Sequence, residues 1–257
     1  MSENNPHEPF FLENPADNGL VVFIHGFMGS PRQFIRLAET VHRQGLSAAA
    51  LLLPGHGGSV KAFGVGTAAR WQEHVDSEVE RFANDYASIW LVGHSMGGLL
   101  AINAAVKYSA HIRGIFPIAC PFKLTKFSAL SSQLKRFRLR RVLSINSDTI
   151  KAAYRGSCSI QLSASLLWRI VKPMSEVEKL IQATKDNLPN IRIPMTAVYS
   201  TSDELTAIGS LEILKSGLDG VAFEHLVLSD SMHAYYPEHD MAAVEQALVN
   251  MVYGPRK

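Results

Sequence analysis

The chain has 257 residues, of which 47% are hydrophobic and 19% are charged, and its formal net charge is +2. This composition excludes an intrinsically disordered chain, and so small a net charge gives no indication of nucleic-acid binding. Two cysteines are too few for a disulfide scaffold, no apolar run is long enough to span a membrane, and residues 1–18 lack the apolar segment of a signal peptide. We therefore expect a cytoplasmic protein that is built mainly as one domain.

Short apolar runs recur along the chain, and most of them are continuous rather than alternating. Strands that are buried on both faces of a parallel sheet have this pattern. The runs are Leu20–Ile24, Ala48–Leu53, Ile89–Val92, Ile115–Ala119, Met195–Tyr199 and His225–Leu228.

Helical patterns lie between these runs, and the alternation predicts an α/β fold with helices on both faces of the sheet. Ser30-Pro31 predicts the start of the first helix and Gly45 its end. The other predicted helices are an amphipathic one over residues 71–86, a small-residue-rich one over Ser95–Tyr108, one opened by a capping box at Ser175–Glu178, and a last one capped by Asp240 that runs to Tyr253.

Residues 121–174 interrupt this alternation. The segment has no clear strand, and it holds eleven Lys or Arg residues but only one acidic residue, Asp148. Its formal charge of +10 leaves −8 for the remainder of the chain. We interpret it as an insertion or small subdomain, residues 121–174, within a core domain of residues 1–120 and 175–257.

The segment Gly93–Gly97 fits the pattern G-x-S-x-G. A predicted strand precedes it and a predicted helix follows, so Ser95 lies on a strand-to-helix turn, where flanking glycines permit a strained backbone. A serine hydroxyl needs a histidine base that a carboxylate orients. Asp203 and His233 each follow a predicted strand, in the order that this nucleophile turn requires.

Two other carboxylates compete for the role of the acid. Glu204 is adjacent to Asp203, and Asp230 precedes His233 by three residues. We prefer Asp203 because it comes first on the loop after its strand, whereas Asp230 has the sequence context of a turn residue.

A second loop, His25–Gly29, follows the first apolar run. An oxyanion hole needs two backbone N–H donors, one from the residue after the nucleophile and one from such an early loop. These positions are Met96 and Phe27. The alternative is a simple glycine-permitted loop between a strand and a helix.

Together, the segments His25–Phe27, Pro54–Gly57 and Gly93–Gly98, with Asp203 and His233, resemble the α/β-hydrolase superfamily. Within it they look like the serine carboxylesterase and monoacylglycerol-lipase-like branch. The resemblance implies a mostly parallel sheet, a helical cap where residues 121–174 lie, and no cofactor. Asp203 is followed by Glu-Leu-Thr rather than the apolar-Val-Pro common in the branch, and Met232 stands where glycine is usual.

The resemblance implies a serine hydrolase that cleaves carboxylic esters, monoacylglycerols among them, through an acyl-enzyme. The partner is then a small-molecule ester. A thioesterase, a carbon–carbon bond hydrolase and a non-catalytic binding protein of the same fold are alternatives, because a fold alone does not fix the reaction.

Two further classes of site are disfavoured by spacing. No HExxH or Cys/His cluster indicates a metal site. Gly64–Ala69 fits the dinucleotide pattern G-x-G-x-x-A and Asp85 follows at a suitable distance, but no predicted strand leads into Gly64.

A helix over Lys126–Arg141 would place an apolar stripe beside a cluster of cations. The stripe consists of Phe127, Leu130, Leu134 and Phe137, and the cations are Lys135, Arg136, Arg138, Arg140 and Arg141. We expect the stripe to cover Ser95 as an apolar roof, which favours short- to medium-chain acyl esters over polar ones. Weak contact of the cations with an anionic lipid surface is the alternative.

Overall fold

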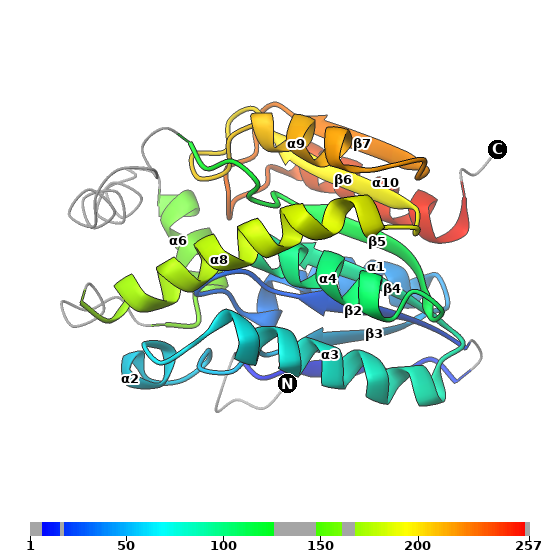
Figure 1. Cartoon of the computed structure of the whole chain (residues 1–257), viewed down its shortest axis with the longest axis horizontal. Coiled ribbons are helices and arrows are strands. Elements are labelled where there is room, and N and C mark those ends of the chain that lie inside the picture. Colours follow the sequence, from blue (N-terminus) through cyan, green and yellow to red (C-terminus); the bar gives the residue numbers. More distant parts are fainter. Residues whose placement is uncertain (1–6, 16–17, 126–147, 161–167, 255–257) are drawn as a thin grey trace.

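The computed structural model describes residues 7–15, 18–125, 148–160 and 168–254 (Figure 1). Their strands form one seven-stranded sheet in the order β1-β3-β2-β4-β5-β6-β7. Only the pairing of β1 with β3 is antiparallel. The strands are β1 (Phe10–Leu12), β2 (Gly19–Ile24), β3 (Ser47–Leu51), β4 (Ser88–His94), β5 (Ile112–Ile118), β6 (Met195–Ser200) and β7 (Phe223–Leu228).

The prediction of a mostly parallel sheet is therefore confirmed, and all six predicted strands are present. In β2, alternate residues enter different cores, because successive side chains of a strand point to opposite faces. Leu20, Val22 and Ile24 pack in one core, whereas Val21 and Phe23 pack in the other. Burial on both faces is why this strand reads as one unbroken apolar run.

Helices cover both faces of the sheet. The first core also contains α3 (Ala68–Asp85), α4 (Met96–Lys107) and α8 (Val171–Asn187), which lie in front of the sheet in Figure 1. The second core contains α1 (Ile35–Arg43) and α10 (Glu238–Tyr253). The shorter elements are η1 (Pro31–Phe34), α2 (Val60–Phe63), α6 (Asp148–Ser157), η2 (Leu188–Asn190) and α9 (Gly209–Gly217).

Two of the predicted helix starts are wrong. Helix α8 begins at Val171, and Ser175 lies inside it with its Oγ donating to the carbonyl oxygen of Lys172 at 2.8 Å. Helix α10 begins at Glu238, and the carboxylate of Asp240 bonds the loop before the helix instead of capping it. In both cases the capping side chain has found another partner.

The predicted insertion lies between β5 and β6, and its described parts are residues 121–125, 148–160 and 168–174, which include α6 and the first residues of α8. The predicted boundary at residue 174 falls inside α8, and the division into core and insertion stays a prediction. The predicted helix Lys126–Arg141, with its apolar stripe and cations, lies outside the described residues. Within the described part of the chain, none of the helices has the length and apolar character needed to cross a bilayer.

Candidate active site

The candidate residues lie on loops that follow parallel strands. Ser95 follows β4, Asp203 follows β6 and His233 follows β7. Because the carboxyl ends of parallel strands meet at one edge of the sheet, these loops converge there. The same edge carries the loop after β2, which includes Phe27.

The turn at Ser95 is strained and tightly packed. Ser95 has φ 54° and ψ −121°, in the region of positive φ that L-residues rarely adopt. A Cβ atom on Gly93 would lie 2.3 Å from the carbonyl oxygen of Gly97, and one on Gly97 would lie 2.0 Å from that of Ile24. Only glycine fits at these two positions, so α4 can begin directly against the sheet.

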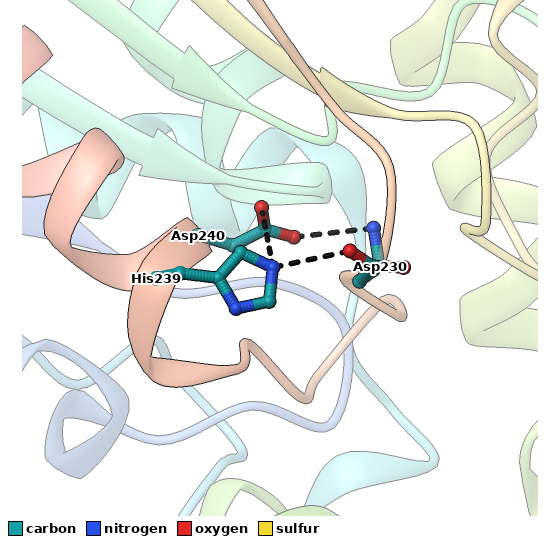
Figure 2. A group of neighbouring side chains, drawn as sticks. All are labelled: Asp230, His239 and Asp240. Carbon is teal, nitrogen blue, oxygen red and sulfur yellow. Dashed lines mark hydrogen bonds and ion pairs between the residues drawn. The ribbon is translucent and has the colours of Figure 1, made fainter.

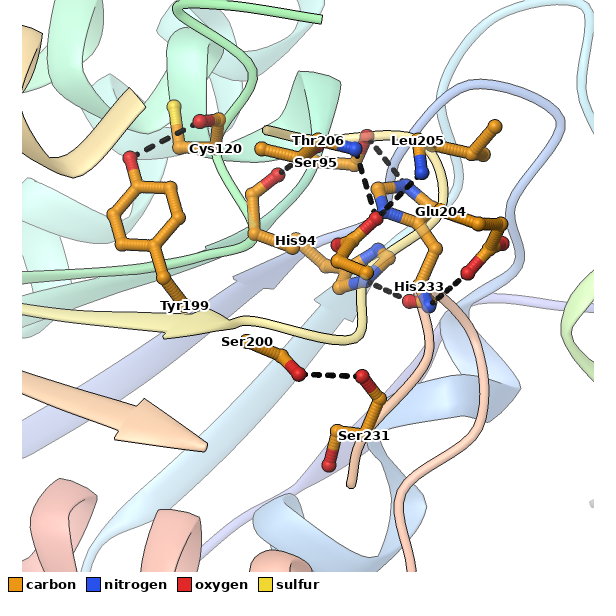
Figure 3. Close-up of polar contacts among 12 residues, drawn as sticks. His94, Ser95, Cys120, Tyr199, Ser200, Glu204, Leu205, Thr206, Ser231 and His233 are labelled. Atoms are coloured by element: carbon orange, nitrogen blue, oxygen red, sulfur yellow. Dashed lines mark hydrogen bonds and ion pairs between the residues drawn. The ribbon is translucent and has the colours of Figure 1, made fainter. Parts of the chain in front are cut away.

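The structure brings the side chains of Ser95, His233 and Asp203 into one hydrogen-bonded chain. Figure 3 shows Ser95 and His233 among their polar neighbours. Nε2 of His233 is 3.0 Å from Oγ of Ser95. Nδ1 of the same ring is 2.9 Å from Oδ2 and 3.2 Å from Oδ1 of Asp203. Since a carboxylate only accepts, Nδ1–H donates to Asp203, which leaves Nε2 free to accept the hydroxyl proton of Ser95.

Asp203 is buried, and both of its carboxylate oxygens accept hydrogen bonds. Its Oδ1 accepts the backbone N–H groups of Leu205 and Thr206, both at 2.8 Å. Burial raises the pKa of Asp203, but the His233 imidazole and these N–H groups outweigh it and hold the pKa below its ordinary value. Asp203 is therefore ionised at neutral pH and can orient the imidazole.

The two competing carboxylates have other contacts. Oε2 of Glu204 accepts the backbone N–H of His233 at 3.0 Å. Oδ2 of Asp230 is 3.1 Å from Nε2 of His239, and both of those side chains are largely exposed. The geometry supports Asp203 as the acid.

Buried polar contacts fix the loop that carries His233. Asp240 Oδ2 accepts the hydroxyl of Ser231 at 2.7 Å and the backbone N–H of Asp230 at 3.2 Å. The hydroxyl of Ser200, at the end of β6, donates to the carbonyl oxygen of Ser231 at 2.5 Å. These contacts tie the ends of β6 and β7 to the start of α10.

One group of potential metal ligands lies beside this loop in the described part of the chain. The ligand atoms of Asp230, His239 and Asp240 all lie within 4.8 Å of one another (Figure 2). The imidazole of His239 reaches both carboxylates, at 3.1 Å and 3.4 Å. These contacts form a polar network beside the loop of residues 229–237 that carries His233, here called the histidine loop.

Two buried histidines, His25 and His56, hold the loop after β2. Nε2 of His25 accepts the N–H of Leu53 at 3.0 Å, and Nε2 of His56 accepts the N–H of Met28 at 3.2 Å. Burial lowers the pKa of His56 to about 4, so its ring is neutral and able to accept. The second bond fixes Met28, the residue after Phe27.

Backbone strain is concentrated at this edge of the sheet. Among the described residues, the non-glycine residues with positive φ are Met28 at 59°, Ser95 at 54° and Ala119 at 50°. They follow β2, β4 and β5, which are adjacent in the sheet. Such conformations cost free energy and are typical of functional sites.

A small, mostly apolar cavity of about 170 Å³ lies next to the histidine loop. It is bounded by His94 and Ile118 at the strand ends, by α6 and by residues 234–236. A separate apolar cluster of Met28, Phe63, Ile160 and Ile170 lies against Phe27. The site is thus flanked by apolar surface on two sides.

Residues 15–240 match the Hydrolase_4 family, which is described as serine aminopeptidase, S33. The chain belongs to this family. It has the α/β-hydrolase fold and is similar to the monoacylglycerol-lipase-like branch.

Individual relatives agree with this assignment over nearly the whole chain. A thermostable monoacylglycerol lipase of Bacillus sp. (strain H-257) is 27% identical over 253 residues, which cover 95% of each chain. A monoacylglycerol lipase structure from Paleococcus ferrophilus superimposes with a TM-score of 0.74 at 19% identity and covers 96% of this chain and 99% of its own. A monoglyceride lipase structure from Saccharomyces cerevisiae gives 0.72 at 16% identity and covers 97% and 92%. At such identities, the structural matches show the fold.

Proposed function

We propose that the protein is a carboxylesterase that hydrolyses short- to medium-chain acyl esters, monoacylglycerols among them, through an acyl-enzyme. The observation that carries the proposal is the chain of contacts from Ser95 Oγ through the His233 imidazole to Asp203. The names of the relatives, which are monoacylglycerol and monoglyceride lipases, support an ester as the substrate.

Acylation begins at Ser95. Its Oγ attacks the acyl carbonyl carbon while Nε2 of His233 takes the hydroxyl proton, and Asp203 stabilises the imidazolium that forms. The carbonyl oxygen becomes an oxyanion, which accepts hydrogen bonds from the N–H groups of Phe27 and Met96, each worth about 3 kcal/mol in the transition state. His233 then donates the proton to the departing alkoxide, and the alcohol leaves.

Deacylation repeats these steps with water. His233 takes a proton from a water molecule, whose oxygen attacks the carbonyl carbon of the acyl-enzyme. The oxyanion again accepts the N–H groups of Phe27 and Met96. Its collapse breaks the bond to Ser95 Oγ, which receives the proton from His233, and the carboxylic acid leaves. No step uses a cofactor.

The surroundings support an apolar acyl group. The cluster of Met28, Phe63, Ile160 and Ile170 lies beside the loop that carries Phe27, and apolar walls favour hydrocarbon over polar substituents. We therefore expect higher activity on esters with an apolar acyl group than on esters with a polar one.

A fluorophosphonate probe and a panel of substrates test the proposal together. The probe should label Ser95, and Ser95→Ala should remove both labelling and hydrolysis of p-nitrophenyl butyrate. Turnover should be highest on short p-nitrophenyl esters and monoacylglycerols, and lower on acyl-CoA and vinylogous diketones. Full esterase activity in Ser95→Ala contradicts the proposal. A preference for acyl-CoA or a diketone would show that the substrate is a thioester or a diketone rather than an ester.

A further inference from the structure

The carboxylate of Glu204 joins two parts of the molecule that are far apart in sequence. Its Oε2 accepts the backbone N–H of His233 at 3.0 Å, and its Oε1 accepts the hydroxyl of Tyr154 on α6. Tyr154 lies 50 residues before Glu204, and His233 lies 29 residues after it. One side chain therefore connects α6 directly to the residue proposed as the base.

The direction of these hydrogen bonds is defined by chemistry. Burial, with the nearby charge of Glu204, raises the pKa of Tyr154 far above its ordinary value, so its hydroxyl keeps its proton and donates. The backbone N–H of His233 can only donate. Glu204 must accept both bonds, and a carboxylate has acceptor sites for both.

His233 is held from three directions. Glu204 fixes its N–H, Nε2 of His94 contacts its carbonyl oxygen at 2.8 Å, and Asp203 fixes its ring. A shift of the backbone at His233 would move Nε2 away from Ser95 Oγ. The position of the ring thus depends on the backbone contacts as well as on Asp203.

The segment before α6 is attached to the same loop. The hydroxyl of Thr125 donates to the carbonyl oxygen of Glu204 at 3.1 Å, and the N–H of Thr125 donates to the carbonyl of Leu205 at 3.1 Å. Leu124 forms a bridge with Thr206. Thr125 precedes residues 126–147 in the sequence and Tyr154 follows them, and both contact Glu204.

We propose that Glu204 is a positioning residue, which couples the position of His233 to the position of α6. The inference rests on the proposed function, because it assigns His233 as the base. It gives a role to the side chain directly after Asp203, which bonds the backbone of His233 rather than its imidazole. It also makes the rate of the chemical step dependent on a helix of the predicted insertion.

A double-mutant cycle with Glu204→Ala and Tyr154→Phe tests the inference. Glu204→Ala should lower kcat on p-nitrophenyl butyrate about 10- to 100-fold with little change in KM, since a misplacement of about 1 Å costs catalysis up to about 100-fold. Tyr154→Phe should give a smaller loss of the same kind. The Tyr154 hydroxyl also contacts the backbone N–H of Ala234, so adding Tyr154→Phe to Glu204→Ala should cause a smaller loss than Tyr154→Phe causes alone.

A conservative variant provides the rescue. The amide of Glu204→Gln can accept the N–H of His233 through its oxygen and donate to the Tyr154 hydroxyl through its nitrogen, so kcat should recover most of the loss. This variant and Tyr154→Phe keep the test valid if Glu204→Ala fails to fold. The matched controls are Glu212→Ala, on the exposed side of α9, and Tyr253→Phe, which removes a hydroxyl bonded to the carbonyl oxygen of Gln44.

The rate of fluorophosphonate reaction with Ser95 separates the two proposals. Absence of labelling in the unmodified protein overturns both the proposed function and this inference. Normal labelling and kcat in Glu204→Ala, additive losses in the cycle, or losses in KM alone overturn only the inference. Slower labelling in Glu204→Ala, recovered in Glu204→Gln, supports it.

Discussion

Nε2 of His94 lies 2.8 Å from the carbonyl oxygen of His233. Burial, with the neighbouring ring of His233, lowers the pKa of His94 to about 3, so the ring is neutral at physiological pH. A carbonyl oxygen only accepts, so His94 carries its proton on Nε2 and donates it. The residue before Ser95 thus holds the histidine that contacts Ser95.

His94→Phe should weaken both folding and catalysis. The variant leaves a buried carbonyl oxygen without its donor, which costs about 1–3 kcal/mol of the free energy of unfolding. Urea unfolding measures this loss, and kcat on p-nitrophenyl butyrate should fall with it. His225→Phe, at an exposed position of β7, is the control, and equal effects in the two variants would contradict the role of His94.

Asp203→Asn should lower kcat about 10⁴-fold, because an amide no longer selects the His233 tautomer in which Nε2 carries no proton. Asp230→Asn should have little effect, since Asp230 contacts the exposed His239. Steady-state kinetics on one soluble ester measures both. If Asp230→Asn is the damaging change, the assignment of the acid is wrong.

Gly97→Ala should prevent folding or leave the protein severely destabilised. Its Cβ would lie 2.0 Å from the carbonyl oxygen of Ile24, a backbone atom that cannot move aside cheaply. Gly58→Ala is the matched control, because nothing lies within 4 Å of a Cβ there. Thermal unfolding should show Gly58→Ala near the parent protein, whereas a stable Gly97→Ala would mean that the turn at Ser95 is looser than described.

Acid should destabilise the protein as the buried histidines are forced to protonate. Burial lowers the pKa values of His25, His56 and His94, so the unfolded chain binds more protons than the folded one below about pH 6.5. Stability is therefore fully present above that pH and is lost as the pH falls toward 3. Since the pKa of His56 falls from 6.5 to about 4, its share of the loss is on the order of 3 kcal/mol.

Urea midpoints at pH 7, 5 and 4 measure this dependence. His56→Gln should flatten it, because glutamine binds no proton, whereas the exposed substitution His225→Gln should leave it unchanged. A midpoint that rises on acidification would show that the histidines are not neutral when folded.

Strands β2 to β6 were predictable because burial on both faces produces continuous apolar runs in the sequence. Strand β1 was not, since Phe10–Leu12 has only three residues and pairs at the edge of the sheet. Helix starts failed where a capping residue had a tertiary alternative. Asp240 has the right chemistry for a cap, yet its carboxylate bonds Ser231 across the histidine loop.

The candidate site shows the same limit. Motif order and strand ends indicated Ser95, Asp203 and His233, and the structure brings their side chains together. The contacts of Glu204 and His94 with the backbone of His233 could not be predicted, because they depend on loop conformations and on α6. The residue type of a side chain does not show which backbone atom it will bond.

The strained backbone at Met28, Ser95 and Ala119 lowers the stability of the folded protein, and at Ser95 the strained residue is the proposed nucleophile. Each positive φ costs about 1–3 kcal/mol, more than the roughly 0.5–1 kcal/mol by which glycine's freedom favours the unfolded chain. Ser95→Gly should therefore yield an inactive protein that resists heat better than its parent. Selection for thermostability alone would favour glycine at these positions. Selection for activity keeps the serine side chain at position 95 despite its strained backbone.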